Sequence, residues 1–491
     1  MIAAVERPGL DWFAISPSLI LLIAAGVSLL AAVLVPRAAR RATAAGATAA
    51  GFAGAFVAAV LLYDRTPVGM NVIADTVRRD RYFAMAAMIL AAVGLVAVLV
   101  SWAEPMGDHV AEYYALVGTA AAGMIFLTQA NTLMTLFLGL EWFSISLYIL
   151  CAIDHERERS LEAGLKYLVV GGFGSAVLLF GSALVYGTTG RLSFDGIAEA
   201  VEAGGLSHDT MLLTGLAMII VGLGFKASAA PFHMWTPDVY EGAPTPVTAF
   251  MAAATKVAAL LLTLRILVTA FPQEQHLWTI AIAVIAVCSL VVGNYAALVQ
   301  KNLKRLLAYS SISNAGFMLI AVSANSALGG RALLYYLVPY SAASIGAFAV
   351  IAARERELGR EVTVDNLAGM GWERPLLGAS MWVFMLSFAG LPPTGGFLAK
   401  FYVFSAAYEH GWLWLVIIGV LATAVSLYYY LNVIRALYLR PSAELQFAAG
   451  GQPPREWLLQ AGTTGCIVVV IGSFFAVQPL IDLAEKAIAS L

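Results

Sequence analysis

Apolar runs of about 20 residues recur from one end of the chain to the other, and they constrain its fold more than any other feature. Each run is long enough to cross a hydrocarbon core of about 30 Å as an α-helix. None shows the alternation, over about ten residues, that is typical of a membrane β-strand. Of the 491 residues, 61% are hydrophobic and 12% are charged, whereas soluble domains carry about 25% charged residues. The sequence therefore predicts an all-α integral membrane protein, and it excludes a soluble enzyme.

We count fourteen predicted membrane spans, all of them helical. They cover residues 16–36, 44–63, 82–102, 111–130, 131–153, 161–187, 209–230, 246–270, 275–299, 303–325, 330–353, 376–408 (interrupted), 412–438 and 456–482. An even number of crossings places both termini on the same side of the membrane. The net charge of −2 gives no basic surface for nucleic acid.

Basic residues divide unequally between the loops on the two sides. The odd-numbered loops hold fifteen of them: Arg37, Arg40, Arg41, Arg157, Arg159, Lys301, Lys304, Arg305, Arg354, Arg356, Arg360, Arg374, Arg435, Arg440 and Arg455. The even-numbered loops hold six: Arg65, Arg78, Arg79, Arg81, Arg191 and Arg331. Because cytoplasmic loops are enriched in Lys and Arg, we expect the odd loops to face the cytoplasm. Both termini would then lie on the outer, periplasmic side of a bacterial inner membrane.

A few ionisable residues remain inside the predicted spans. They are Glu141, Lys166, Lys226, Lys256, Arg265 and Lys400. Such a charge at mid-depth costs about 2.5–3.5 kcal/mol on insertion scales, and it usually lines a hydrated path or pairs with another charge. Arg265 lies about five residues from a span end, so we expect its long side chain to reach the membrane surface. For Lys166 this interpretation and a role inside the protein both stay open, whereas Glu141 and Lys256 lie too deep for it.

Two of the spans are interrupted by glycine and proline beside a lysine. The first break reads GLGFK at 222–226 and AAPFHMWTPD at 229–238, and the second reads GLPPTGGFLAK at 390–400. Proline removes a backbone donor and disrupts a helix, and irregular backbone persists at membrane depth only inside protein or against a polar cavity. A broken helix beside a lysine in each half therefore predicts an ion path in an inverted-repeat transporter.

Weaker signals accompany the two breaks. His233 lies in the first break and could relay protons, while Tyr309, Ser310 and Ser311 lie in the tenth span, where hydroxyls often bond across helices. No two histidines have ligand spacing, and the three cysteines lie far apart with no CxxC pair. The sequence therefore predicts no metal site and no iron–sulfur cluster in this chain.

Four segments carry a resemblance to a known family. They are LKYLVVGGFGSAVLLFG from Leu165, FKASAAPFHMWTPDVYEGAPTP from Phe225, LKRLLAYSSISNAGFML from Leu303 and LSFAGLPPTGGFLAKFYVF from Leu386. They resemble the antiporter-like membrane subunits of proton-pumping NADH:quinone oxidoreductase, respiratory complex I, over about residues 100–440. The resemblance implies two inverted five-helix repeats, spans four to eight and nine to thirteen, with spans seven and twelve interrupted. It divides the chain into an N-terminal three-helix segment (1–108), a first repeat (109–270), a second repeat (271–438) and a C-terminal loop and helix (439–491).

The same resemblance assigns a proton path to four residues. They are Glu141 in span five, Lys226 before the first break, Lys256 in span eight and Lys400 in span twelve. A lysine in low dielectric beside water can release its proton near neutral pH, and a nearby carboxylate opposes that release. We therefore expect Glu141 to modulate Lys226, which would pass protons through water to Lys256, with Lys400 in the outlet half.

The resemblance also implies which cofactors belong to partner subunits and which partners this chain has. We expect flavin, iron–sulfur clusters and quinone in partner subunits, and no cofactor in this chain. Its partners would be other membrane-arm subunits and the lipid bilayer, and it would belong to a translocase. Three alternatives stay open from sequence: a subunit of a multi-subunit cation/proton antiporter, the homologous arm of a membrane hydrogenase or ferredoxin-linked dehydrogenase, and an inert structural helix bundle.

Overall fold

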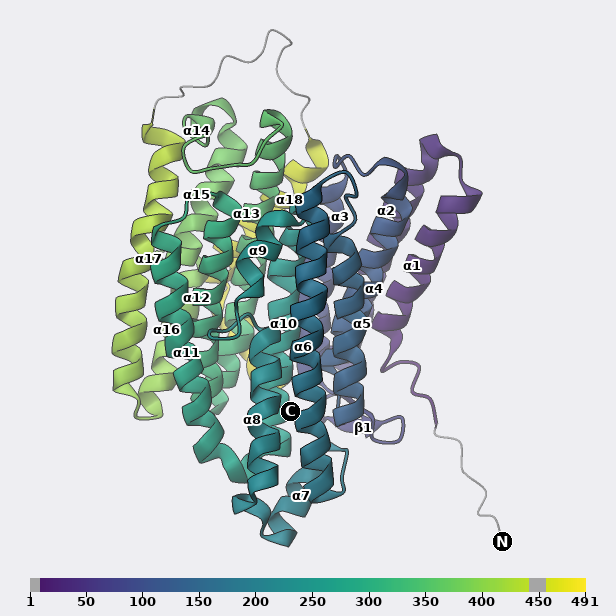
Figure 1. The fold of residues 1–491 in the computed structure, drawn as a ribbon, viewed down its shortest axis with the longest axis vertical. Coiled ribbons are helices and arrows are strands. Elements are labelled where there is room, and N and C mark those ends of the chain that lie inside the picture. The colour runs from purple at the N-terminus through teal and green to yellow at the C-terminus, as the bar shows by residue number, and fades with distance from the viewer. Residues whose placement is uncertain (1–8, 441–455) are drawn as a thin grey trace.

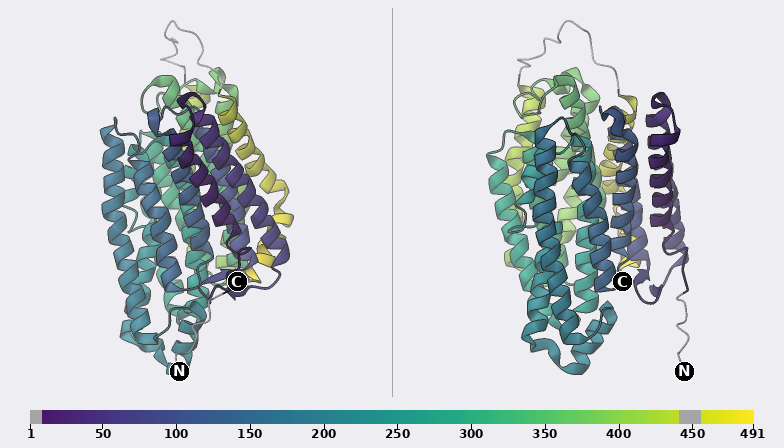
Figure 2. Two further views of the ribbon diagram at one scale, coloured as in Figure 1. Left: turned by 90° about the vertical axis from the view of Figure 1, so that its right-hand side faces the viewer. Right: turned by 45° about the vertical axis from the view of Figure 1, so that its right-hand side comes forward.

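The computed structural model describes residues 9–440 and 456–491, which form a bundle of long, roughly parallel helices (Figure 1). The N-terminal segment contains α1 (Ser16–Leu34), α2 (Arg37–Arg65), the antiparallel hairpin of β1 (Met70–Val72) and β2 (Val77–Arg79), and α3 (Arg81–Ser101). The C-terminal segment contains α18 (Trp457–Phe475) and α19 (Val477–Ile488). Figure 2 shows these last helices beside the first ones, and both α18 and α19 contact α3.

The two predicted repeats form the rest of the bundle. Residues 109–270 contain the end of η1 (Gly107–His109), then α4 (Val110–Thr128), α5 (Leu133–Cys151), α6 (Glu158–Thr189), α7 (Phe194–Gly204), η2 (Leu206–His208), α8 (Thr210–Lys226), α9 (Trp235–Gly242) and α10 (Thr245–Ala270). Residues 271–438 contain η3 (Pro272–Glu274), α11 (Gln275–Leu298), α12 (Leu303–Ser323), α13 (Ala327–Leu358), α14 (Met370–Glu373), α15 (Pro375–Ala389), α16 (Gly395–Glu409) and most of α17 (Leu413–Leu439).

Twelve helices among the described residues are long and apolar enough to cross a membrane, and α8 and α15 are shorter apolar helices. The predicted all-α membrane fold is confirmed. The interruptions also fall where the sequence places them, after Lys226 and after Ala389. If α8 with α9 and α15 with α16 each count as one broken span, the chain makes fourteen crossings; this count stays a prediction.

The last predicted span, 456–482, is wrong in its C-terminal part. The membrane helix α18 ends at Phe475, and α19 follows as a separate helix. Ile481, Ala484 and Ala487 form the buried side of α19, while its charged residues alternate with them, so this stretch is amphipathic rather than apolar throughout. The hairpin and α7 are absent from the spans that the sequence predicts. Arg455, which the sequence places in the last odd-numbered loop, lies outside the described residues.

Ion pairs between loops show that the odd-numbered loops gather at one end of the bundle. Arg37 pairs with Asp108, and Arg356 pairs with both Glu104 and Glu456. We call this end the basic face; α14 lies there, at the top of Figure 1. The opposite end, which we call the hairpin face, carries β1 and α7.

Both ends of the described chain lie at the hairpin face. Asp11 pairs with Arg79 of β2 at 2.8 Å, and near the other end Ser490 accepts a hydrogen bond from the Arg81 backbone N–H. This agrees with an even number of crossings. Which face is cytoplasmic stays a prediction from the charge count.

The two halves repeat one backbone arrangement at opposite ends of the bundle. An isolated antiparallel bridge joins Thr132, just before α5, to Ser193, just after α6. An equivalent bridge joins Asn302, just before α12, to Thr363, after α13. Because α5 begins at the hairpin face and α12 at the basic face, the correspondence is what an inverted repeat requires. The exact repeat boundaries stay predictions.

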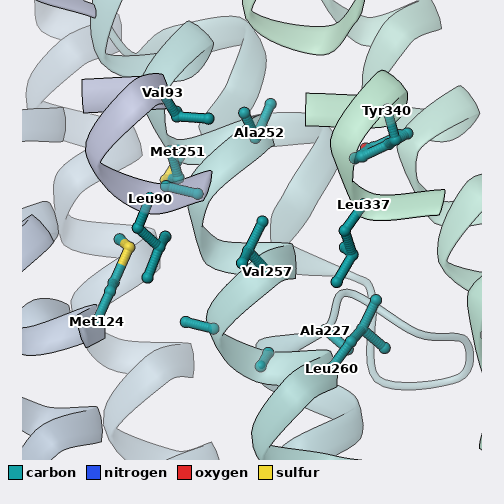
Figure 3. Close-up of a cluster of buried hydrophobic side chains, with 14 of the residues drawn as sticks. Leu90, Val93, Met124, Ala227, Met251, Ala252, Val257, Leu260, Leu337 and Tyr340 are labelled. Atoms are coloured by element: carbon teal, nitrogen blue, oxygen red, sulfur yellow. The ribbon is translucent and has the colours of Figure 1, made fainter. Parts of the chain in front are cut away.

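Helix α10 lies at the centre of the packing. Leu90 and Val93 of α3, Met124 of α4 and Leu337 of α13 surround Met251, Ala252 and Val257 of α10 (Figure 3). The most apolar stretch of α10 is entirely buried. A polar side chain on this helix therefore depends on internal partners, because none of its faces reaches solvent or lipid.

Candidate proton path

Lys226 is the last residue of α8, and its side chain is 3% exposed. Its Nζ donates to Ser144 Oγ of α5 at 2.6 Å. The same nitrogen lies 5.3–5.7 Å from four aromatic rings, those of Phe143, Tyr148, Tyr167 and Phe225. Aromatic faces attract an ammonium, but they do not replace a carboxylate, so Lys226 is held by neutral groups.

Glu141 lies on the same helix as Ser144, three residues earlier, which places both on one side of α5. Its side chain is half-buried, and its Oε1 atom is buried with no hydrogen-bond partner in the described part of the protein. No ion pair joins Glu141 to Lys226 among the described residues. Any influence of the carboxylate on Lys226 therefore acts through space or through water, and the predicted modulation stays a prediction.

Lys256 of α10 is fully buried, and it faces the first break. The chain leaves α8 through Ser228, which has a left-handed φ of +59°. Lys256 Nζ donates to the backbone carbonyl of Ala227 at 3.1 Å. Helix ends leave carbonyls without intrahelical partners, so the lysine satisfies one that the break has freed.

Lys400 of α16 makes the corresponding contact at the second break. Its Nζ donates to the carbonyls of Phe388 at 2.9 Å and Ala389 at 3.3 Å, at the end of α15. The ammonium also lies 4.4 Å from the ring centroid of Phe317 on α12. Gly390 ends α15 with φ +76°, and a Cβ there would come within 2.8 Å of the lysine side chain. The left-handed turn therefore favours glycine, and the Lys400 side chain lies directly against it.

A hydroxyl and amide network joins α12 to α13 and α17 inside the second half. Ser310 Oγ lies 2.5 Å from Tyr430 Oη of α17, and Ser311 Oγ accepts from Tyr340 Oη of α13 at 3.2 Å. Asn314 accepts from Tyr336 Oη at 2.9 Å. The predicted residues Ser310 and Ser311 thus belong to a buried polar network, whose tyrosine members the sequence did not identify.

The other secondary candidates lie elsewhere. Lys166 is 42% exposed in its side chain and pairs with Glu162 and Asp238, at 2.7 and 2.9 Å. Tyr309 is half-buried beneath the Arg305 guanidinium. His233 is half-buried in the first break, with a buried Nδ1 that has no partner in the described part of the chain. The structure therefore does not bring these three residues into contact with the buried lysines.

The expectation that Arg265 reaches the membrane surface is wrong. Its side chain is 0% exposed and makes two hydrogen bonds to Asp80, at 2.7 and 3.0 Å. Asp80 is equally buried and also caps α3 by accepting from the Phe83 backbone N–H. The sequence placed Asp80 in a loop, and only the packing of the hairpin against the bundle brings the two charges together.

Lys304, which the charge pattern places in a loop, is a further buried lysine. It lies in the first turn of α12 at the basic face, with its side chain 7% exposed. Its Nζ donates to the Ala243 carbonyl at 2.8 Å and to Thr245 Oγ1 at 3.1 Å, and it lies 4.0 Å from Glu355. Charge patterning could not identify it, because a cluster of basic residues after an apolar run is typical of an exposed loop.

Known proteins share the sequence pattern of this chain. A family described as NADH:quinone oxidoreductase/Mrp antiporter, transmembrane, matches residues 130–426. The NADH-quinone oxidoreductase subunit N of Trichlorobacter lovleyi is 44% identical over 80% of this chain and 81% of that protein. Subunit N 2 of the same enzyme from Roseiflexus castenholzii is 39% identical over 98% and 97%. The motifs also resemble subunit N more closely than the related subunits L and M, and the relatives confirm that prediction.

Solved structures show the same fold. A chain of respiratory complex I from Thermus thermophilus, solved with bound aureothin, superposes with a TM-score of 0.80 at 33% identity, over 96% of this chain and 99% of that one. A chain of the Mrp complex from Dietzia sp. superposes with a TM-score of 0.84 at 22% identity, over 97% of each chain. The second likeness concerns the fold alone.

Proposed function

The chain belongs to the NADH:quinone oxidoreductase/Mrp antiporter transmembrane family, and from this premise we propose that protons cross it along Glu141, Lys226, Lys256 and Lys400. It is a proton-translocating membrane-arm subunit of NADH:quinone oxidoreductase. Electron transfer takes place in partner subunits, which hold the flavin, the iron–sulfur clusters and the quinone. The membrane is a bacterial inner membrane, and the basic face is cytoplasmic.

One observation supports the path above all others. The residues Lys226, Lys256 and Lys400 are at most 4% exposed, and none of them has an ion-pair partner among the described residues. Each ammonium instead donates to a neutral oxygen. A buried structural cation is normally paired with a carboxylate, as Arg265 is with Asp80. Lysines held by neutral oxygens can lose and regain a proton without leaving a buried carboxylate unpaired.

The surface near the path supports a membrane arm of several subunits. Both breaks reach the outside of this chain, where Pro231, Met234, Pro392 and Pro393 are exposed. Irregular backbone at membrane depth has to be covered by protein. The half-buried Glu141 carboxylate likewise needs a polar neighbour rather than lipid. Neighbouring membrane subunits therefore cover both breaks and the outer side of α5.

The antiporter alternative has weaker support, because the likeness to the Mrp complex is one of fold at 22% identity. The relatives at 39–44% identity carry the oxidoreductase name over most of this chain. Coupling to electron transfer is therefore the function that the sequence relationships favour.

Substitution of Lys256 in the assembled complex tests the proposal. We expect Lys256→Met to reduce NADH-driven proton pumping by inside-out vesicles about 100-fold or more, the range typical of lost proton-transfer groups. Lys256→Arg is expected to be nearly as harmful, because a guanidinium keeps its proton. Assembly is checked by the amount of purified complex. Full pumping by the Arg variant would show that the position needs only a fixed charge and would contradict the proposal.

A further inference from the structure

A cavity of about 560 Å³ opens on the basic face. It lies between the loop that joins α3 to α4 and the loop that joins α5 to α6. Glu104, Asp108 and His109 of the first loop line it, together with Asp154, His155 and Glu156 of the second. The buried lysines lie deeper in the bundle, so the cavity is separate from the four-residue path.

Two histidines meet in this cavity. The rings of His109 and His155 come from different loops, yet their centroids lie 4.9 Å apart with an interplanar angle of 32°. His155 Nδ1 lies 3.2 Å from the Ala152 carbonyl oxygen, which favours the tautomer that leaves Nε2 free to accept a proton. The pair therefore places two imidazoles from different loops beside the carboxylates that line the cavity.

Tyr113 gives a second, independent sign that the cavity holds a polar ligand. Its side chain is 1% exposed, it lines the cavity, and its hydroxyl has no hydrogen-bond partner in the described part of the protein. A buried hydroxyl without a partner is costly, and water in a cavity of this size satisfies it. An ordered water beside Tyr113 would connect the histidine pair with the inner end of the cavity.

The inner end of the cavity reaches the buried polar groups around Lys304. Pro244 and Pro246 line it, and Thr245 between them donates to Glu355 and accepts from Lys304. Glu104, at the side of the cavity, pairs with Arg356 at 2.5 Å. Burial raises the pKa of the Glu104 carboxyl, although Arg356 opposes the rise, so this group holds a proton at higher pH than an ordinary surface carboxylate.

Beyond Lys304 the polar groups continue toward Lys256. The Tyr240 hydroxyl is buried without a hydrogen-bond partner among the described residues, and it faces Thr255 of α10 and Ser311 of α12. Thr255 directly precedes Lys256. Thr245 and Lys256 are eleven positions apart on one helix, which is about 16 Å at 1.5 Å per residue. Water beside Tyr240 would divide that distance into steps short enough for proton transfer.

We infer that this cavity is the entrance through which protons reach Lys256, with His109 and His155 as the collecting pair and Lys304 as the first buried acceptor. The inference rests on the proposed function and adds its uptake site. A proton leaves water for an imidazole nitrogen, passes to the Glu104 or Glu355 carboxylate, and then to the neutral Lys304 amine. From there it moves through water beside Tyr240 to Lys256. Each step breaks one N–H or O–H bond and forms another, so no further reactant is needed.

The rate of proton supply explains why a collecting pair is useful. Diffusional encounter has a limit of about 10¹⁰ M⁻¹ s⁻¹, so at pH 9 a single acceptor meets roughly ten hydronium ions per second. A typical enzyme turns over about ten times per second, and several protons per turnover would exceed that supply. A surface group that exchanges protons with water and buffer removes the limit, and its loss matters only at alkaline pH.

A test of this entrance must leave unchanged the charged residues that face the histidines and Lys304. They are Arg37, Glu104, Asp108, Asp154, Glu156, Arg157, Glu241, Glu355 and Arg356. The first test therefore changes only the two histidines, with the double variant His109→Gln/His155→Gln. His208→Gln is the matched control, because His208 is exposed on the opposite, hairpin face.

NADH-driven pumping by inside-out vesicles containing the whole complex is measured from pH 6.5 to pH 9. The double variant is expected to match the parent at pH 6.5 and to pump about 3- to 10-fold more slowly at pH 9, the point where direct supply becomes limiting. Added imidazole buffer is expected to restore the rate, because a diffusible base replaces the lost pair. The control is expected to match the parent throughout. An unchanged pH profile, or an equal loss at every pH without rescue, would overturn the inference.

Lys304 is tested separately with two variants. Both Lys304→Met and Lys304→Arg are expected to slow pumping at every pH, although arginine keeps the bonds to Ala243 and Thr245. A fully active Arg variant would show that Lys304 only caps a carbonyl. If Lys256→Met abolishes pumping while the histidine and Lys304 variants leave it intact, the path stands and the entrance lies elsewhere.

Discussion

The two halves of the path hold their lysines in different ways. At the second break one lysine, Lys400, donates to two carbonyls at the end of the broken helix. At the first break that task belongs to Lys256, which comes from another helix, and Lys226 donates to a side chain, Ser144. The first half thus has a lysine that supports the backbone and a second one that does not. Lys226 can therefore change its protonation or position at little cost to the fold, which suits a residue controlled by Glu141.

The helices that end the two halves differ in burial as well. The apolar stretch of α10 is entirely buried, whereas only 28% of the corresponding stretch of α17 is buried. Part of the cause is α3 of the N-terminal segment: α10 packs against α3 as well as α4, α12 and α13, while α17 packs against α11, α14, α15 and α16. Helix α3 therefore helps to seclude Lys256 from lipid, and α17 keeps an open apolar face.

The first prediction tests how the N-terminal segment is held on α10. Asp80→Asn preserves the cap of α3 but leaves Arg265 buried without a negative partner, which costs about 3–5 kcal/mol in comparable buried pairs. Arg265→Met is expected to cost less, because Arg78 remains 3.5 Å from Asp80. The measurement is thermal unfolding of the purified complex, together with the yield of assembled complex.

The double variant Asp80→Asn/Arg265→Met serves as the control for that experiment. It removes both charges, so it is expected to be more stable than Asp80→Asn alone. If Asp80→Asn is as stable as the parent, the ion pair does not hold the segment, and the burial of α10 has another cause.

The Asp80–Arg265 pair also shows where prediction from sequence ends. The breaks could be predicted, and the four candidate path residues could be proposed, because each is a local departure from an apolar run: glycine, proline or a charge where lipid would not tolerate it. Asp80 and Lys304 lie at helix starts beside other charges, and their burial depends on how the hairpin and the loops fold over them. The length and polarity of a segment predict a helix, but they do not predict which loop packs over the end of that helix. The division of the last span into α18 and α19 has a different cause, because it follows from the local amphipathic pattern of α19.

The second prediction compares the two lysines at the breaks directly. Lys400→Met leaves the carbonyls of Phe388 and Ala389 without a donor, and an unsatisfied buried polar group costs about 1–3 kcal/mol. Lys226→Met leaves no backbone group unpaired, and Ser144 keeps its bond to the Leu140 carbonyl. Both variants are expected to lose pumping, but only Lys400→Met is expected to lower the thermal stability of the complex clearly. Equal stability of the two variants would remove the structural distinction between the breaks.

The last prediction tests whether Lys226 is the adjustable member of the first half. Its only hydrogen-bond acceptor among the described residues, Ser144, lies one turn from Glu141 on α5. Glu141→Asp keeps the charge and moves it by about one methylene, so we expect partial pumping, roughly a few-fold below the parent, which corresponds to about 1 kcal/mol.

Glu141→Ala and Lys226→Ala each remove the same switch, so the double variant is expected to be no worse than the more severe single one. Ser144→Ala is the matched control on the same helix face, because it removes the contact to Lys226 and leaves the carboxylate in place. Pumping rates of all five variants, corrected for the amount of assembled complex, give the coupling between the two charges. Strictly additive losses from Glu141→Ala and Lys226→Ala would show that the two residues act independently, and the difference between the two halves would then be one of backbone support alone.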